Sequence, residues 1–523
     1  MFQTRYFRVQ LCFLPFLFIT CNETETNSNR PNILIAMADD ISFPHMGAYG
    51  AKWIVSPAFD EIASKGLLFE NAFTPNAKCA PSRAILLTGR NSWQLEEAAN
   101  HWPYFPEKFK SIFESLEDNG YHTGYTGKGF APGITGTKGG INRELVGKNY
   151  SFRKTVPLTA GISDIDYASN FSEFLKNKKK NQPFSFWYGS LEPHRSFEYG
   201  SGKKHLNTKF DEINQFPSYF PDSDSVKNDL LDYALEINYF DLHLGKMIKT
   251  LHENGELDNT IIIVTADNGM AFPRAKGQAY DASNHIPLTI MWNNGIKNVG
   301  RVIKDFISFA DFVPTILEAT GISWSKSGMA ELEGQSIIDI FRDSKNINHR
   351  NHILVGKERH DVGRPNDLGY PIRGIRTHNF LYLVNFESDR WPAGNPETGY
   401  LNCDGSPTKT LILNRKRYGL NPTFWDLSFS KRPKKELYYI IDDPHCLINL
   451  AGSEEYKKIE QRMHKELIAR LVEQKDPRII ANGDIFDKYL YADVKHQNFY
   501  ERYVNGLISS KSARWVNETD FEE

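Results

Sequence analysis

Two pairs of oxygen-bearing side chains in this 523-residue chain each come directly after an apolar run. Asp39 and Asp40 follow the run NILIAMA, and Asp267 and Asn268 follow the run TIIIVTA. Carboxylate and amide oxygens are the ligands that a hard divalent cation such as calcium prefers. Each pair alone is equally consistent with a turn at a strand end. Taken with a cysteine motif elsewhere in the chain, the two pairs predict a cation site.

That cysteine motif opens the segment CAPSRAILLTGR, where Cys79 is followed by Pro81 and Arg83. The pattern is short, so a buried structural cysteine beside a turn proline is an alternative interpretation. Of the five cysteines, two lie near the N-terminus, and Cys403 and Cys446 could form a disulfide in an exported protein. Cys79 would then be unpaired, which calls for a chemical explanation.

A sheet is needed to position these side chains. Asn32–Ala38, Phe184–Ser190 and Thr260–Ala266 are short apolar runs typical of buried parallel strands, and helical patterns lie between them. Ligands of open parallel sheets gather at the carboxyl ends of the strands. The order of elements therefore predicts an α/β layered domain with a central, mostly parallel sheet, and places the polar residues at its functional edge.

The polar segment Asp343–His352 is the predicted domain boundary. It divides a catalytic domain over residues 31–345 from a smaller C-terminal α+β domain over residues 350–485. We expect residues 486–523 to form a C-terminal tail whose polar part after Ile508 is exposed or frayed. The elements expected in the C-terminal domain are the strands Phe380–Phe386 and Glu436–Ile441 and the helix Lys457–Gln474.

The first 30 residues predict export. Two arginines precede the apolar run Leu11–Ile19, which is too short to cross a bilayer, so residues 1–21 are interpreted as an export signal and residues 22–30 as a tether. Cys21 stands where a bacterial lipoprotein would be cleaved and acylated, although ordinary signal cleavage is an alternative. We therefore expect a periplasmic protein or an outer-membrane lipoprotein attached through Cys21.

The charge balance argues against a nucleic-acid partner. The chain has 62 basic and 64 acidic residues, which gives a formal net charge of −2. Binding to a polyphosphate backbone requires a strong basic field, and the overall composition supplies none.

The motifs occur in an order that resembles the type I, formylglycine-dependent sulfatase family. The segments PNILIAMADD, CAPSRAILLTGR, TGK, EPH and ADNG follow one another as in that family, and KGQAYD resembles its next lysine motif. DNGMAFPRAK and EPHR most resemble the branch that contains heparan N-sulfatases and bacterial polysaccharide sulfatases of the ulvan type. The resemblance implies an alkaline-phosphatase-like layered fold with a smaller C-terminal domain.

The resemblance also implies a chemistry for the site. A maturation enzyme would convert Cys79 to formylglycine, whose hydrate offers one hydroxyl to attack sulfur and a second to expel sulfate. Arg83 would orient the hydrate, and His194 would protonate the leaving alcohol oxygen or hold the sulfate. Lys128 and Lys276 would neutralise sulfate oxygens. The implied calcium ligands are Asp39, Asp40, Asp267, Asn268 and the oxygen of modified Cys79.

One position departs from the family pattern. Many relatives carry a histidine two residues after the lysine that matches Lys128, whereas this chain has Phe130. That histidine assists the formylglycine, so this chain must manage without it or use another donor such as His122. A surface or core role for His122 is the simpler interpretation.

The C-terminal domain completes the substrate cleft in the resembling branch. We therefore predict that Arg359, His360 and Arg376 bind carboxylates or further sulfates of a polyanionic sugar. Solvated surface charge is an equally good interpretation of each.

The sequence thus predicts an exported, calcium-dependent sulfuric ester hydrolase. Its substrate would be a sulfated polysaccharide or its oligosaccharides, with algal ulvan as an example, and its other partner a formylglycine-generating or anaerobic maturation enzyme. Three alternatives stay open: an N-sulfoglucosamine sulfohydrolase, a phosphoesterase of the same fold, and a non-catalytic sugar-binding lipoprotein.

Overall fold

The computed structural model describes residues 1–2, 4, 30–344, 350–480 and 482–522. The predicted export signal and tether therefore lie almost wholly outside the described residues, and so does Cys21. Within the described ranges, no helix is both long enough and apolar enough to cross a membrane.

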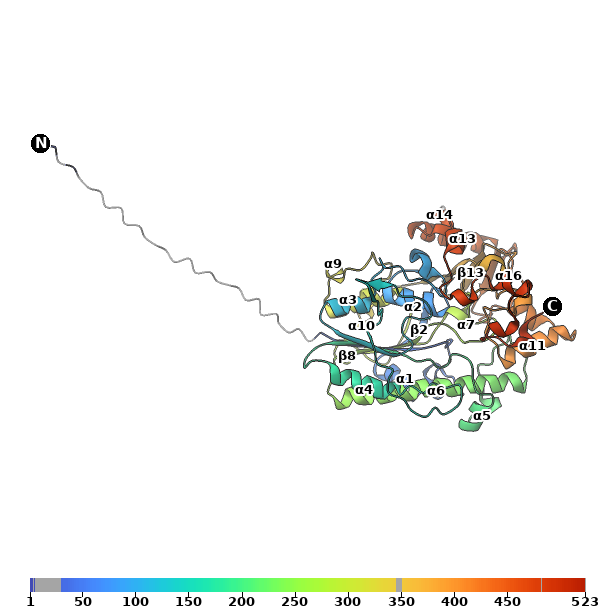
Figure 1. The fold of residues 1–523 in the computed structure, drawn as a ribbon, viewed down its shortest axis with the longest axis horizontal. Helices are drawn as coiled ribbons and strands as arrows, with labels where there is room; N and C mark the ends of the chain where they lie inside the picture. Colours follow the sequence, from blue (N-terminus) through green and yellow to red (C-terminus); the bar gives the residue numbers. More distant parts are fainter. Residues whose placement is uncertain (3, 5–29, 345–349, 481, 523) are drawn as a thin grey trace.

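A sheet of eight strands forms the centre of the larger part of the described chain (Figure 1). The strand order is β10-β2-β9-β8-β1-β7-β3-β6. Among these strands only β9 runs antiparallel to its neighbours, β2 and β8, so the expectation of a mostly parallel sheet is confirmed. The bounds are β1 Asn32–Ala38, β2 Leu67–Phe73, β3 His122–Gly127, β6 Lys148–Asn149, β7 Phe184–Gly189, β8 Thr260–Ala266, β9 Leu288–Met291 and β10 Arg301–Ser308.

Helices cover both faces of this sheet, as continuous apolar strands require. Alternate side chains of β1 enter two different cores: Ile33 and Ile35 face one, and Leu34 and Ala36 face the other. The first core also contains side chains of α2, α3 and α8, and the second those of α1, α4 and α6. The helix bounds are α1 Pro57–Lys65, α2 Cys79–Thr88, α3 Ile112–Asp118, α4 Tyr167–Asn177, α6 Asp224–Glu253 and α8 Phe312–Thr320.

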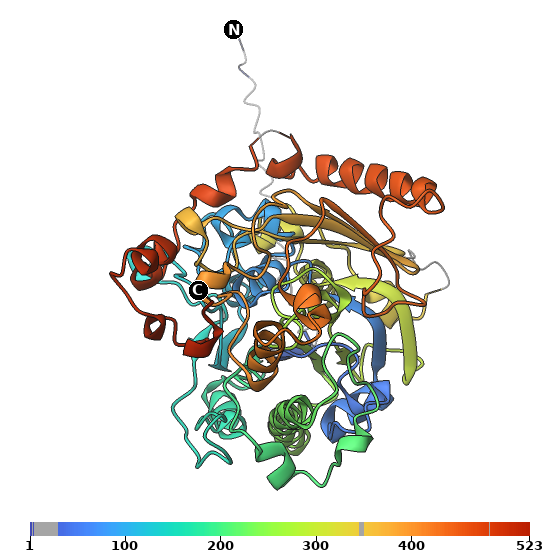
Figure 2. The same ribbon diagram turned by 90° about the vertical axis from the view of Figure 1, so that its right-hand side faces the viewer.

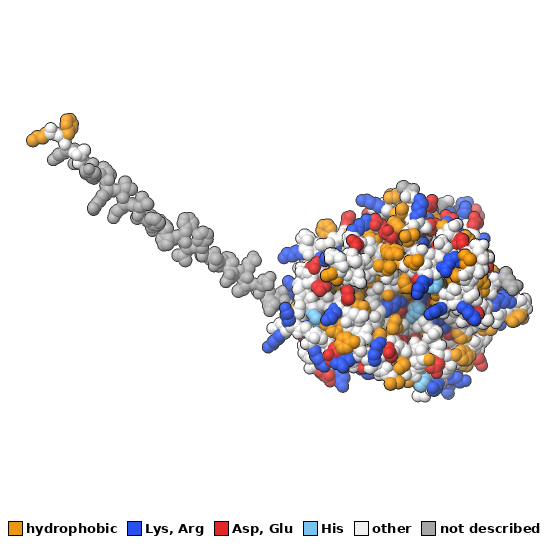
Figure 3. Space-filling view, in the orientation of Figure 1, with side chains coloured by type: hydrophobic (Ala, Val, Ile, Leu, Met, Phe, Trp, Pro, Cys, Tyr) orange, Lys and Arg blue, Asp and Glu red, His pale blue; other side chains and the backbone are white. Residues whose placement is uncertain are grey.

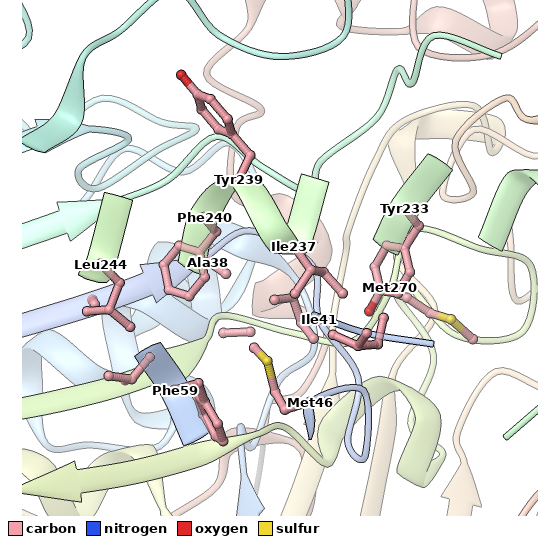
Figure 4. Packing of buried hydrophobic residues seen from close by; sticks show 14 of the residues in the cluster. Ala38, Ile41, Met46, Phe59, Tyr233, Ile237, Tyr239, Phe240, Leu244 and Met270 are labelled. Atoms are coloured by element: carbon pink, nitrogen blue, oxygen red, sulfur yellow. The ribbon is translucent and has the colours of Figure 1, made fainter. Parts of the chain in front are cut away.

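Helix α6 is the long helix under the sheet in Figure 1. The Ser223 hydroxyl accepts a hydrogen bond from the first turn at 3.4 Å and so caps the helix. Phe240 of α6 lies against Ala38, the last residue of β1 (Figure 4). This packing holds the strand end rigidly just before the acidic pair Asp39 and Asp40.

A second, antiparallel sheet of four strands forms the smaller part of the described chain, in the order β11-β12-β13-β14. Helix α13 (Lys457–Glu473) packs across it through Met463 and Leu467 (Figure 2). The predicted C-terminal strands and helix are present, each within two residues of its expected ends. The strand bounds are β11 His352–Lys357, β12 Ile372–Thr377, β13 Phe380–Asn385 and β14 Lys435–Tyr439.

Residues 486–522 pack against the body of the protein, although the part after Ile508 was expected to be exposed or frayed. Phe499, the first residue of α16 (Phe499–Val504), is fully buried. The Trp515 indole donates a hydrogen bond to the Leu401 carbonyl at 2.8 Å. Sequence reasoning missed this packing because the apolar residues of the segment are scattered among polar ones and form no long strand or helix pattern.

Candidate active site

The ends of β1 and β8 bring the predicted cation ligands together. The two strands are parallel neighbours in register, so the residues that follow them lie side by side. Asp39, Asp40, Asp267 and Cys79 can each point a ligand atom into one cluster in which these atoms all lie within 4.8 Å of one another. All four residues and Asn268 are buried.

Cys79 is the first residue of α2. Its Sγ atom lies 3.4 Å from Asp39 Oδ1. Burial raises the pKa of the Cys79 thiol, and the negative charge of Asp39 raises it further. The free amides at the start of α2 surround this position and favour an anion there.

Arg83 fixes the geometry beneath Cys79. Its Nε and Nη2 atoms lie 3.0 and 2.9 Å from Asp267 Oδ2. Its Nη1 atom donates to the carbonyls of Lys128 and Gly129, both at 2.8 Å. The side chain is fully buried, so Arg83 ties the end of β8 to the end of β3.

Two lysines and a histidine approach the same cluster. Lys128 pairs with Asp39, and Lys276 lies 2.7 Å from Asp40. Burial raises the pKa of Asp39, but Lys128, His194, Arg83 and Lys276 outweigh that effect and hold its pKa well below the usual range. The geometry thus gathers the five residues that the sequence predicted to be catalytic.

Asp267 behaves differently from Asp39. Burial raises the pKa of Asp267 to about 7, and the charge of Asp39 raises it as well, against the opposing effect of Arg83. Closely spaced buried carboxylates are expected to repel in this way unless a cation lies between them.

The donor set fits a calcium ion. Three carboxylates share one buried cluster with Asn268, whose Oδ1 atom has no hydrogen-bond partner among the described residues. A buried carbonyl oxygen without a partner is costly, and binding a cation would satisfy it. Hard oxygen donors in this number suit calcium better than a soft transition metal.

Asp404 is a site residue that the sequence analysis missed. Its Oδ2 atom lies 2.9 Å from the Lys276 amine. Ligand atoms of Asp404, Asp40 and His194 lie within 4.8 Å of one another. No motif marked Asp404, because its neighbours in the site are far away in the sequence.

A cavity of about 430 Å³ opens over Cys79. Its volume lies in the range of small-ligand sites. Cys79, Lys128, His194 and Lys276 line it. The rest of its lining comes largely from residues that the sequence did not single out: Lys78, His101, Trp102, Asp361, Asp404, Tyr491, Asp493, His496 and Trp515.

The three residues predicted to bind substrate do not line this cavity. Arg359 is buried over an aromatic ring, and His360 Nε2 lies 2.8 Å from Asn76 Oδ1. The Arg376 guanidinium pairs with Asp281 at 2.9 Å. Their charged and polar atoms face the protein interior, so we correct the interpretation of these residues from substrate contacts to internal packing and pairing.

The two positions raised by the departure from the family pattern also lie away from the cysteine. His122 begins β3, at the opposite end of the strand from Lys128, and stacks on Phe174 with ring centroids 4.4 Å apart. Phe130 packs edge-on against Phe105. His122 therefore takes the core role that was the simpler interpretation.

The disulfide that Cys403 and Cys446 could form is absent in the part of the chain that the structure describes. Cys403 and Cys446 are both free and buried, and they belong to different apolar clusters. A disulfide between Cys403 and Cys446 therefore does not single out Cys79 as the unpaired cysteine.

Comparison with known proteins decides the family. A family model described as Sulfatase matches residues 31–322, more than half of the chain. The chain belongs to the sulfatase family. This sulfatase is therefore a sulfuric ester hydrolase, and the resemblance in its motifs is confirmed. Sulfatases typically use calcium and formylglycine, and the buried acidic and cysteine cluster is where this chain could hold them.

The sulfatase is similar to two curated relatives over most of its length. It is 27% identical to human N-sulphoglucosamine sulphohydrolase over 503 residues, which covers 88% of this chain and 94% of the relative. It is 26% identical to an ulvan-active sulfatase of Formosa agariphila over 455 residues, which covers 86% and 81%. A solved structure in complex with its substrate D-glucosamine-2-N,6-O-disulfate matches the fold with a TM-score of 0.61 at 19% identity, covering 86% of this chain and 99% of that one.

Proposed function

We propose that this sulfatase removes sulfate from a sulfated carbohydrate, a polysaccharide or its oligosaccharides of which algal ulvan is an example, with Cys79 converted to formylglycine and one calcium ion bound beside it. The observation that carries the proposal is the buried cluster of Cys79 with Asp39, Asp40 and Asp267 at the floor of an open cavity. The names of the two curated relatives support a carbohydrate substrate.

Asp39, Asp40, Asp267 and Asn268 would hold the calcium ion, which supplies a Lewis acid for sulfate oxygens. A formylglycine at position 79 would supply the hydroxyl nucleophile that a buried thiol lacks.

The other residues of the cavity have roles that follow from their positions. Lys128 and Lys276 line it, and fixed cations there stabilise the charge of a transferring sulfuryl group. His194 also lines the cavity, so it can give a proton to the leaving oxygen. Arg83 is fully buried and keeps Asp267 in place.

A second candidate is hydrolysis of the S–N bond of an N-sulfated glucosamine. The similarity to N-sulphoglucosamine sulphohydrolase over 88% of the chain favours it. The same nucleophile and cations would serve, and His194 would protonate nitrogen instead of oxygen. Matched N-sulfated and O-sulfated glucosamine substrates distinguish the two reactions.

Export and attachment through Cys21 are part of the proposal and rest on the sequence alone. Cell fractionation with labelled fatty acid tests them. Label in wild type that disappears in Cys21→Ala supports the lipid anchor, and unlabelled protein in the periplasm supports ordinary export.

The central experiment uses protein produced together with a formylglycine-generating enzyme. Peptide mass spectrometry should show formylglycine at position 79, and the protein should hydrolyse 4-nitrophenyl sulfate much faster than 4-nitrophenyl phosphate. Cys79→Ala should abolish turnover, whereas Cys446→Ala, which also removes a buried free cysteine, should not. Active enzyme with only unmodified thiol would refute the formylglycine, faster phosphate hydrolysis would favour the phosphoesterase, and folded, modified but inactive protein would favour a binding role.

A further inference from the structure

The lysines that line the cavity all have acidic partners. Among the described lining residues, Lys128 and Lys276 stand beside the cation cluster, and Lys78 is the one further lysine. The Lys78 amine lies 2.7 Å from Asp361 Oδ2, so its charge is already matched. No arginine is present among the lining residues that the structure describes.

His101 adds no positive charge to the cavity wall. His101 Nδ1 lies 2.9 Å from the same Asp361 carboxylate. Burial nevertheless lowers the pKa of His101 to about 4, against the opposing pull of Asp361, so the ring is neutral near pH 7. The Lys78, His101 and Asp361 group therefore offers hydrogen bonds but no free cation.

Two further carboxylates, those of Asp404 and Asp493, line the cavity. Asp404 contacts Lys276, and its carboxylate lies within 4.8 Å of a ring nitrogen of His194, the proposed proton donor. Asp493 stands on the wall contributed by the C-terminal segment, where its Oδ2 atom lies 2.6 Å from His496 Nδ1. Because Asp404 pairs with Lys276 and Asp493 with His496, a second carboxylate or sulfate on the same sugar ring would find no unpaired lysine or arginine among the described lining residues to offset the repulsion.

Aromatic rings complete the same wall. Trp102, Tyr491 and Trp515 line the cavity, and the Trp102 and Tyr491 centroids are 6.1 Å apart. Flat aromatic side chains with few rotatable bonds suit the apolar face of a pyranose, while carboxylates accept hydrogen bonds from its hydroxyl or ammonium groups.

From these observations we infer that the cavity is a subsite for a sugar unit with one sulfate and no second anionic group, a neutral hexose, deoxyhexose or aminosugar, and that Asp404 is the residue that rejects uronates and disulfated rings. This inference rests on the proposed function and refines its substrate class. It also reverses the expectation that arginines read a polyanionic ring. The arginines predicted for that role instead form internal contacts, as the pairing of Arg376 with Asp281 shows.

The test compares matched substrates that differ by one carboxylate. Galactose and galacturonate sulfated at O2, O3 or O4 form three such pairs, because the members differ only at C6. With calcium-loaded, formylglycine-containing enzyme, the neutral member of each pair that is turned over should have a kcat/KM at least 10-fold higher. Asp404→Asn should reduce that ratio to about threefold or less by improving the uronate member relative to the neutral one.

Both substrates of a pair are compared with the same variant. A general loss of activity caused by breaking the contact between Asp404 and Lys276 therefore cancels in the kcat/KM ratio. The Asp493 side chain has no contact with the catalytic cluster. Asp493→Asn should also lower the kcat/KM ratio of neutral to uronate substrate, but by less than Asp404→Asn does. Glu454→Gln is the matched control, because it removes a carboxylate on the exposed surface and should leave the ratio unchanged.

A ratio near one in wild type, a preference for uronates, or a ratio unaffected by both aspartate variants would overturn the inference. Turnover of 4-nitrophenyl sulfate with no turnover of any galactose or galacturonate sulfate would also overturn it. Modified enzyme that fails on 4-nitrophenyl sulfate itself would instead refute the proposed function.

Discussion

Replacing Arg83 by methionine should destabilise the protein in a way that depends on calcium. The guanidinium makes two contacts of about 3 Å with Asp267 and two hydrogen bonds of 2.8 Å with backbone carbonyls, and both charged side chains have no exposed surface. Removing one partner of such a buried pair leaves an uncompensated charge and costs about 3–5 kcal/mol. In chelator, that loss should lower the urea midpoint by roughly 1–1.5 M.

Calcium should reduce the loss, because a bound cation would compensate Asp267 when Arg83 is gone. Unfolding in urea, followed by tryptophan fluorescence in chelator and in excess calcium, measures both values. Arg143→Met is the matched control, since Arg143 makes the same kind of buried two-point contact with Glu114 at 2.8 and 3.0 Å, away from the cluster. The decrease in the free energy of unfolding caused by Arg143→Met should be equal in chelator and in excess calcium. An Arg83→Met loss below about 1 kcal/mol, or one that calcium does not change, would refute the reasoning.

Four further outcomes follow from the structure. Removal of calcium should abolish turnover, re-addition should restore it, and calcium at about 100 times its Kd should stabilise the fold by about 2.7 kcal/mol; full activity in metal-free enzyme, checked by elemental analysis, would contradict the site. Cys79→Ser should resist conversion by a cysteine-specific maturation enzyme and lose nearly all turnover, and an active Cys79→Ser enzyme without an aldehyde would contradict the proposed nucleophile. Arg376→Ala should lower the free energy of unfolding by about 2–3 kcal/mol, because Asp281 loses its ion-pair partner. The KM for a sulfated oligosaccharide should change by no more than about twofold. A large change in KM with unchanged stability would show that Arg376 binds substrate after all. Trp515→Ala should raise KM on a sulfated oligosaccharide more than on 4-nitrophenyl sulfate, and equal effects on both would remove the indole from sugar binding.

The strands that carry the site could be predicted from the sequence to within a residue. Asn32–Ala38 and Thr260–Ala266 are uninterrupted apolar runs that stop at an acidic residue, so composition marks both ends. Neither run reveals its neighbour, because strand order and register depend on packing between distant segments. The insertion of antiparallel β9 beside β8 had no sequence signal.

The site also contains some residues that the sequence revealed and others that it did not. Cys79 and the acidic pairs were found because their chemistry is concentrated in short motifs. Asp404 was not, because a single aspartate acquires its role only from the lysine that folding brings to 2.9 Å. Arg376 was misjudged for the opposite reason: its charge is visible in the sequence, but its internal partner Asp281 is not.

The packing of the C-terminal segment has a consequence for when Cys79 could be modified during synthesis and folding of the chain. Residues 491–515 include cavity-lining residues, and Cys79 at its floor has only 2% of its surface exposed. A maturation enzyme that must grip the peptide around Cys79 would find it sealed once those last residues have docked. At ordinary rates of synthesis, the interval between the appearance of Cys79 and that of the closing segment is on the order of tens of seconds. On the proposed function, conversion of Cys79 would have to occur within that interval, before these residues dock, so the residues that line the cavity would also set the latest time at which its nucleophile can be made.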